Sequence, residues 1–204
     1  LESLNDNTGT IALLSSGGID GGSGTVLMRA ANYAFGGADR TITTTGVLTI
    51  EPDADENSFA SSFDNQYLNP VSVTGLTLGK SSNASAITLS RAISLSGPVS
   101  IYGGSIDVNA NITANSGNIL LDADTGSTLN QSSTGILLDD VITIETVTSG
   151  NLTLIGRSGD TGSGFDGIDA SSANTTTLRS AGNLTLQGYS YAASGSGRGV
   201  DLNN

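Results

Sequence analysis

One short phrase recurs along the chain and limits the folds that the chain can adopt. Each copy begins with Gly, usually followed by a small polar residue, and continues with apolar residues at alternate positions. Because side chains of an extended strand alternate between its two faces, each copy predicts a short strand with one apolar face and one face of Thr or Ser. Gly and Asn are assigned to the corners, where a positive φ is needed. The copies begin at Gly9, Gly24, Gly46, Gly75, Gly117, Gly150 and Gly182.

The spacing is most regular between residues 93 and 121. There, apolar pairs follow one another at alternating steps of six and seven residues, beginning at Ile93, Val99, Ile106, Ile112 and Ile119. Three steps span residues 93–112 or 99–119, and short strands that always turn the same way close a three-sided coil in three steps. The pattern predicts an all-β, single-domain parallel β-helix, a β-solenoid filled with Ile, Leu and Val. The general preference for right-handed parallel crossovers predicts a right-handed coil.

Longer spacings elsewhere are interpreted as loops inserted at the corners of one continuous solenoid over residues 1–204. The largest insertion is predicted at about 51–70, which lacks strand alternation. Every Phe and Tyr except Tyr102 lies in this or in a smaller insertion. This distribution predicts flaps on the outer wall, or contact surfaces, rather than aromatic side chains inside the tube. The smaller insertions are predicted at about 29–40, 156–172 and 187–199.

The composition excludes several classes of site. The chain has no Cys and no His, which excludes disulfide frameworks, thiolate or imidazole metal sites and Ser–His or Cys–His nucleophiles. Lys and Arg number 7 against 19 Asp and Glu, and the resulting net charge of −12 repels phosphate. No nucleic-acid partner is therefore predicted. The longest apolar runs are only a few residues, so no membrane insertion is predicted either.

The repeated phrases resemble the repeat regions of large secreted bacterial adhesins, the filamentous-haemagglutinin-like and autotransporter-like proteins. The resemblance rests on Gly150–Leu154, Gly182–Leu186 and the run Ser94–Thr113, and it covers nearly the whole chain, least clearly 51–70. It implies a right-handed parallel β-helix, export across the envelope, and a role as a stalk, fibre or attachment surface. The expected location is extracellular or on the bacterial cell surface. The secretion-signal domain expected in such proteins is not recognisable, which leaves the export route open.

One Gly-rich segment carries the candidate metal ligands of the sequence, Asp160, Asp166 and Asp169. Ca²⁺ requires several oxygen ligands on a backbone that bends freely, which such a segment offers. However, the spacing differs from that of an EF-hand, and the nonapeptide of calcium-binding β-rolls is not repeated. The sequence therefore favours a solvated loop over a calcium site. No other cofactor is predicted, and the acidic segment from Glu51 to Asp64 is interpreted as a solvated flap.

The alternative class is a carbohydrate-binding or carbohydrate-degrading β-helix protein, of the lyase or hydrolase type. Such enzymes need paired Asp or Glu side chains a few ångströms apart, or Ca²⁺ with a basic proton acceptor. Here the outward strand positions are mostly Ser, Thr and Asn, with Asp107 nearly alone among them, and the single Lys, Lys80, lies at a predicted corner. The sequence therefore favours a protein that is not an enzyme and has no catalytic residues.

The predicted function is the shaft or a subunit of a bacterial adhesin or surface fibre. The two ends of a solenoid carry unpaired strand edges, which natural solenoids cap, and no capping helix is recognisable here. Two expectations follow. Either the chain is part of a longer array of its own repeats, which is slightly favoured, or like subunits stack end to end into a filament. Surface glycans or a host surface are further candidate partners.

Overall fold

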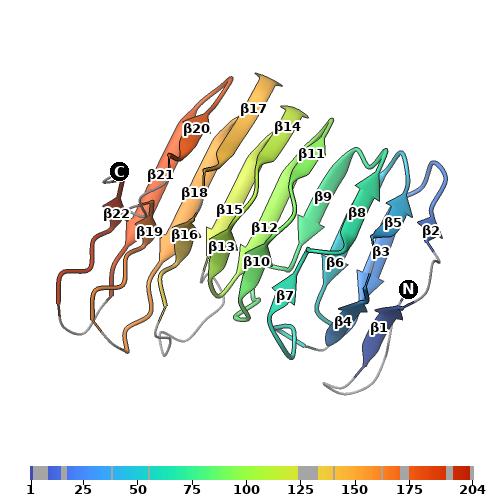
Figure 1. Ribbon diagram of the computed structural model, residues 1–204, viewed down its shortest axis with the longest axis horizontal. Helices are drawn as coiled ribbons and strands as arrows, with labels where there is room; N and C mark the ends of the chain where they lie inside the picture. The colour runs from blue at the N-terminus through green and yellow to red at the C-terminus, as the bar shows by residue number, and fades with distance from the viewer. Residues whose placement is uncertain are drawn as a thin grey trace.

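The computed structural model describes residues 1, 9–14, 18–37, 39–54, 56–123, 133–139, 141–161, 163–170, 175–191 and 195–202. In this part of the chain every regular element is a strand, and every strand pairing is parallel. The strands stack side by side along an elongated molecule, with the two termini near opposite ends (Figure 1). The predicted all-β class and parallel stacking, which are typical of a β-solenoid, are confirmed.

In the described part of the chain, the strands form five parallel sheets. The longest sheet contains, in spatial order, β21 (Leu184–Tyr189), β18 (Leu152–Arg157), β15 (Ile119–Ala123), β12 (Val99–Gly103), β9 (Gly75–Leu78), β6 (Val47–Glu51) and β3 (Val26–Arg29). A six-stranded sheet contains β22 (Val200–Asp201), β19 (Ile168–Asp169), β16 (Ile136–Leu138), β13 (Ile106–Val108), β10 (Ile87–Leu89) and β7 (Phe63–Asp64). The smaller sheets are β11 (Ile93–Leu95), β14 (Ile112–Ser116), β17 (Thr143–Ser149) and β20 (Thr177–Arg179); β2 (Ile19–Asp20), β5 (Arg40–Thr43) and β8 (Leu68–Val71); and β1 (Thr10–Leu13) with β4 (Asn32–Phe35).

Each pairing joins a strand to the strand three places further along the chain, as β12 joins β9 and β15. We call the stretch of chain between two register partners a rung. Ile93 is the register partner of Ile112, and Val99 is the register partner of Ile119. The spacings 93–112 and 99–119, which the sequence assigned to one turn of the coil, therefore each correspond to one rung.

The inward side chains of the seven-stranded sheet form a continuous apolar column. The inward residues of neighbouring strands lie in register, so branched side chains stack directly on one another. Burial of one such side chain contributes about 1.5–3 kcal/mol, so this column is a main source of stability in a chain without disulfides. The side chains of this column that are 0% exposed include Leu48, Ile50, Leu78, Ile101, Leu121 and Leu154.

The Gly–Asn corners explain why the recurring phrase has its two first residues. Gly150 has a φ of 111°, and a Cβ there would lie 1.9 Å from the carbonyl oxygen of Gly117 on the preceding rung. The sequence predicted a positive φ for the corner Asn residues. This prediction is wrong for Asn151, because Ser72 is the only non-glycine residue with a positive φ among the described residues. The Oδ1 of Asn151 accepts the backbone N–H of Asn183 on the next rung at 2.9 Å. The corner Asn is therefore a rung-to-rung hydrogen-bond acceptor.

Several predicted insertions contribute strands as well as loops. Segment 29–40 contains β4, and segment 51–70 contains β7 and most of β8. The Ile/Leu/Val pattern does not detect β7, because its inward residue is Phe63. This residue lies in register with Ile87 of β10. The other two segments also overlap strands, since β19 lies within 156–172 and β21 ends inside 187–199.

Four aromatic rings form a cluster inside the N-terminal half of the stack. Phe59 and Phe63 are each 4% exposed and belong to the core. The Tyr33 ring lies 5.9, 5.6 and 5.7 Å, centroid to centroid, from the rings of Phe35, Phe59 and Phe63. The expectation that aromatic side chains lie outside the tube is therefore wrong for these residues. In this part of the stack, aromatic rings fill core positions that Ile, Leu and Val fill elsewhere.

Candidate functional site

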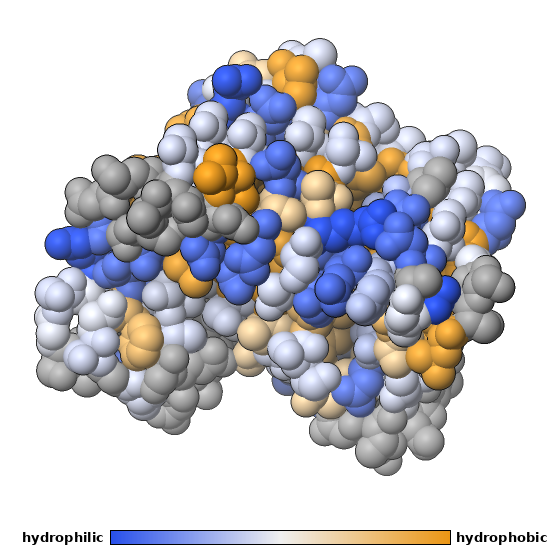
Figure 2. Space-filling model, in the orientation of Figure 1, coloured by the Kyte–Doolittle hydropathy of each residue, from blue (hydrophilic) through white to orange (hydrophobic). Residues whose placement is uncertain are grey.

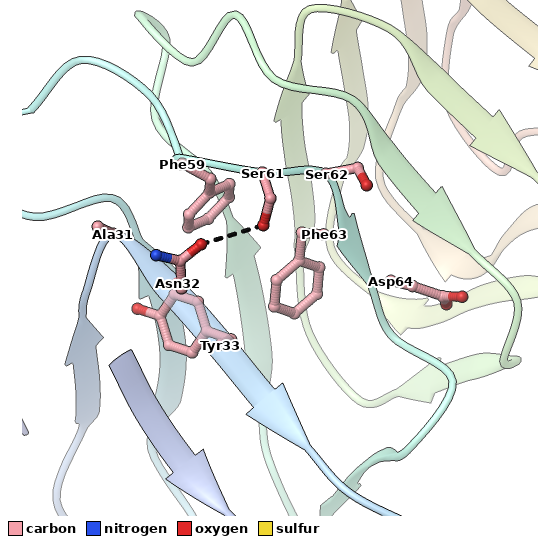
Figure 3. A pocket seen from close by; sticks show the side chains of 8 residues that line it. All are labelled: Ala31, Asn32, Tyr33, Phe59, Ser61, Ser62, Phe63 and Asp64. Carbon is pink, nitrogen blue, oxygen red and sulfur yellow. Dashed lines mark hydrogen bonds between the residues drawn. The ribbon is translucent and has the colours of Figure 1, made fainter. Parts of the chain in front are cut away.

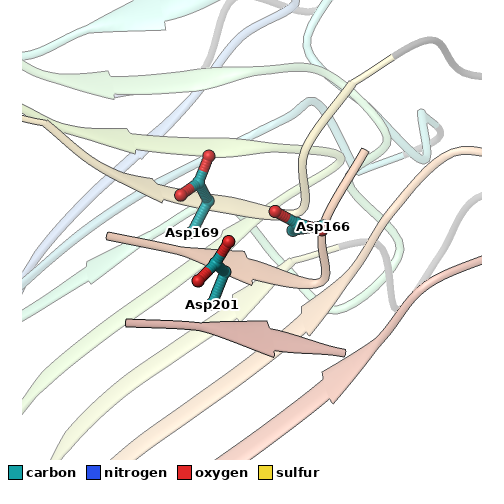
Figure 4. A group of neighbouring side chains, drawn as sticks. All are labelled: Asp166, Asp169 and Asp201. Atoms are coloured by element: carbon teal, nitrogen blue, oxygen red, sulfur yellow. The ribbon is translucent and has the colours of Figure 1, made fainter. Parts of the chain in front are cut away.

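Three carboxylates meet near the C-terminal end of the six-stranded sheet. One oxygen from each of Asp166, Asp169 and Asp201 lies within 4.8 Å of the others. Asp169 and Asp201 are register partners on β19 and β22, and Asp166 lies in the turn before β19 (Figure 4). Three carboxylates at this separation could supply part of the six to eight oxygen ligands of a Ca²⁺ ion.

Arg198 brings a positive charge to this carboxylate group. Its guanidinium forms an ion pair with Asp201, and its backbone N–H donates to Oδ1 of Asp166. The Asp201 side chain is only 5% exposed, and a buried carboxylate is costly unless it is paired and hydrogen-bonded. Arg198 thus allows Asp201 to be buried without a metal ion. The calcium site stays a prediction.

The structure brings together two of the three carboxylates that the sequence singled out. Asp160 lies outside the group, and its Oδ1 is buried without a hydrogen-bond partner among the described residues. Asp201 was missed because it lies one rung further along the chain than Asp169. A signal for it exists in the sequence, since Ile168-Asp169 and Val200-Asp201 repeat the same apolar–Asp pair.

Among the described carboxyl groups, burial raises the pKa of Asp107 and of Asp122, and Asp122 is paired with Arg157. Beyond burial, the charges of Asp139 and Asp64 raise the pKa of Asp107 further, and a hydrogen bond from Asn109 at 3.2 Å opposes them. A glycosidase-type mechanism would need a second carboxylate at a fixed distance across a substrate. The register partners of Asp107 are Thr88 and Leu137, so no carboxylate lies directly opposite it on β10 or β16. The absence of enzymatic activity stays a prediction.

Each of the 7 Lys and Arg side chains forms an ion pair or a hydrogen bond with another residue of the chain. Lys80 donates to the carbonyl oxygens of Asp53, at 3.1 Å, and Glu56. Asp53 is 5% exposed, so this part of the acidic segment is not the fully solvated flap expected from the sequence. Because every cation already has a partner, the chain offers no cluster of free positive charge for an anionic ligand. The ion pairs are Arg29–Glu51, Arg91–Asp39, Arg157–Asp122, Arg179–Glu145 and Arg198–Asp201, and Arg40 donates to backbone carbonyls.

A small pocket lies in the aromatic cluster, where β4 and β7 are not paired. Its volume is about 30 Å³, which is about the space of one water molecule. Asn32 and Ser61 face each other across it, with the Ser61 Oγ 3.1 Å from the Asn32 Oδ1 (Figure 3). The pocket is too small for a substrate, and we interpret it as a packing defect between two rungs.

A larger, apolar cavity opens at the C-terminal end of the stack. Its volume is about 270 Å³. Leu184 and Leu202 in its lining are 47% and 49% exposed, whereas Leu152, the register partner of Leu184, is 0% exposed. The inward face of β21 is therefore apolar, like those of the strands before it, but no further strand covers it among the described residues. The lining residues are Ala170, Thr176, Leu178, Leu184, Leu186 and Leu202.

The outer wall is mixed in character, with apolar residues scattered among hydrophilic ones on the face shown in Figure 2. Among the described residues there is no helix with the length and apolar character needed to cross a membrane. No protein-family model, curated protein or solved structure matches the chain.

Proposed function

We propose that this chain is a non-enzymatic extracellular structural protein, the shaft or a subunit of a bacterial adhesin or surface fibre. The observation that carries the proposal is the seven-stranded sheet from β3 to β21, whose inward residues stack in register and whose last strand, β21, leaves the inward Leu184 47% exposed. Such a stack suits a spacer, because rungs can be added along one axis without changing the core. The proposed location is the cell exterior or cell surface.

The proposed cross-section is a right-handed, three-sided coil. Its support is the pairing of each strand with the strand three places further along, which fits three strands per rung. The preference of parallel crossovers for the right hand supports the handedness. A crystal structure of the chain at a resolution that traces the corners tests both features, and a left-handed coil or a two-sided cross-section would contradict them.

The proposed partners are further rungs of the same kind, either in another copy stacked end to end or in the same protein. Support comes from the positions of β20, β21 and β22, which are the last strands of their sheets in the described part of the chain, and from the exposed Leu184 in the lining of the open cavity. Uncovered strand edges of this kind are templates for pairing with another chain. Electron microscopy and sedimentation of the purified chain test end-to-end stacking.

The matched variants are Leu184→Lys, at the open end, and Val141→Lys, at a site 70% exposed before β17. We expect filaments or higher oligomers of the parent chain, which Leu184→Lys shortens or abolishes and Val141→Lys leaves unchanged. Monomers at high concentration, or equal effects of the two variants, would contradict stacking through this end.

A further inference from the structure

Two tyrosines stand out on the outer wall at the end of β21. Tyr189 and Tyr191 are 42% and 41% exposed, and their ring planes differ by 14° with centroids 6.4 Å apart. The two rings stack on each other, and both residues stay partly exposed to water, whereas the Tyr33 ring is enclosed by other aromatic rings. Exposed aromatic side chains that gather at one place are a common mark of a binding surface.

The two tyrosines are fixed by hydrogen bonds to the preceding turn. The backbone N–H of Tyr191 donates to Ser158 Oγ at 2.9 Å, and the backbone N–H of Ser158 donates to the Tyr189 carbonyl oxygen at 2.9 Å. Between the two rings, Ser190 Oγ donates to the Phe165 carbonyl oxygen at 3.0 Å. The backbone that carries both rings is therefore held before any ligand arrives, which lowers the entropy lost on binding.

Arg157 supports the same surface from the neighbouring strand. It is the register partner of Tyr189, and its guanidinium carbon lies 5.4 Å from the Tyr189 ring centroid. Asp122 Oδ1 accepts from the same guanidinium at 3.1 Å, so the positive charge is already compensated. Gln187 is exposed and lies two positions before Tyr189, which places its side chain on the same face of β21. The surface therefore combines the exposed parts of two stacked aromatic rings with polar groups, and its one guanidinium is paired.

We infer that Tyr189 and Tyr191, flanked by Arg157 and Gln187, form a contact surface for neutral sugar units of a polysaccharide. A hexose ring has an apolar face of C–H groups, which can lie on an aromatic ring, and an edge of hydroxyls, which can bond to polar side chains. Phosphate- and uronate-bearing polymers fit less well, because the net charge is −12 and Arg157 is paired. This inference goes beyond the shaft function and does not depend on it, since it concerns the outward side chains at the end of β21 rather than the inward Leu184 of that strand.

The test is isothermal titration of the full chain with neutral hexasaccharides of glucose, mannose, galactose or N-acetylglucosamine, with polygalacturonate as the anionic comparison. We expect at least one neutral probe to bind. The double variant Tyr189→Ala/Tyr191→Ala should weaken that binding about tenfold or more, because two ring contacts are lost. The double variant Tyr189→Phe/Tyr191→Phe keeps both ring faces and should stay within about threefold of the parent.

Tyr102→Ala is the matched control, because Tyr102 lies on β12 of the same sheet, three rungs from β21. It should leave the affinity unchanged. Tyrosine fluorescence of the parent chain provides a readout that needs no variant, since the chain has 5 Tyr and no Trp. A neutral probe that binds should change this emission, whereas polygalacturonate should not. Three results would overturn the inference: no neutral probe binds, polygalacturonate binds more tightly than every neutral probe, or the alanine pair and the Tyr102→Ala control behave alike.

Discussion

The Oδ1 of Asn151 accepts the backbone N–H of Asn183 at 2.9 Å, and in the same way the Oδ1 of Asn118 accepts the backbone N–H of Asn151 at 2.9 Å. Each corner side chain therefore satisfies a main-chain donor that belongs to the next rung. This relationship gives the repeated Gly–Asn pair a physical reason, because the Asn side chain fixes the height at which the next strand begins.

Replacement of the corner Asn tests this bond directly. We expect Asn151→Ala to lower the free energy of unfolding by about 1 kcal/mol, because the Asn183 N–H loses its acceptor while water can still reach the exposed corner. Asn151→Asp keeps an oxygen in the same place and should lie closer to the parent. Urea unfolding followed by circular dichroism measures both, and equal losses in the two variants would show that the acceptor is unimportant.

The glycine before this Asn is predicted to be much less tolerant of change. Gly150→Ala places a Cβ 1.9 Å from the Gly117 carbonyl oxygen at a φ of 111°, so we expect a loss of about 3 kcal/mol. Gly22 also has a positive φ, 57°, but a Cβ there would meet nothing within 4 Å. Gly22→Ala should therefore cost only about 1 kcal/mol. The prediction fails if chemical unfolding gives the two variants the same stability.

Acidity should affect the stability of the sheet through Asp107. Burial raises the pKa of this carboxyl in the folded chain above its value in the unfolded chain. Its contribution to stability is therefore fully present below the unfolded pKa and is lost as the pH rises through the folded pKa. Asp107→Asn keeps an acceptor for Asn109 and removes the charge, so it should raise the melting temperature at pH 7 and have little effect near pH 3. A variant with the same shift at both pH values would contradict this cause.

The calcium prediction can be sharpened by comparing two aspartates. If the carboxylate group binds Ca²⁺, millimolar Ca²⁺ raises the melting temperature of the parent chain relative to the chelated protein. Asp201→Asn should abolish this shift, because Asp201 belongs to the group, whereas Asp160→Asn should retain it, because Asp160 lies outside. Calorimetric scans with and without chelator measure the shift. An equal melting temperature of the parent chain with Ca²⁺ and with chelator would contradict the calcium site.

The sequence predicts the regular part of the fold well because that part has a local signal. Between Ile93 and Leu121 each apolar pair becomes an inward pair, and the spacing from Val99 to Ile119 is one rung. Strand alternation and short corners are both visible within a few residues, so no knowledge of distant contacts is needed.

The parts that the sequence did not predict depend on contacts between rungs. Phe63 is inward because it stacks on Ile87, a relation that its own neighbours in the chain do not reveal. The same holds for the third carboxylate, since Asp201 joins Asp169 only through the register of β19 and β22. Where loops of different length separate the strands, register cannot be counted from the sequence, and the local pattern then fails.

The pairing of β12 with both β9 and β15 has a consequence for how the length of this molecule could change. Residues 99–118 contain β12, β13 and β14, and their removal would join Pro98 directly to Ile119. Because Leu76 and Ile119 are both register partners of Val99, β15 could then stack on β9 in the same register. The shortened molecule would be about 4.8 Å shorter along the stack, and the inward residues of the remaining strands would stay in register. Length in this protein is thus a property that whole rungs can add or subtract, independently of the chemistry on its walls.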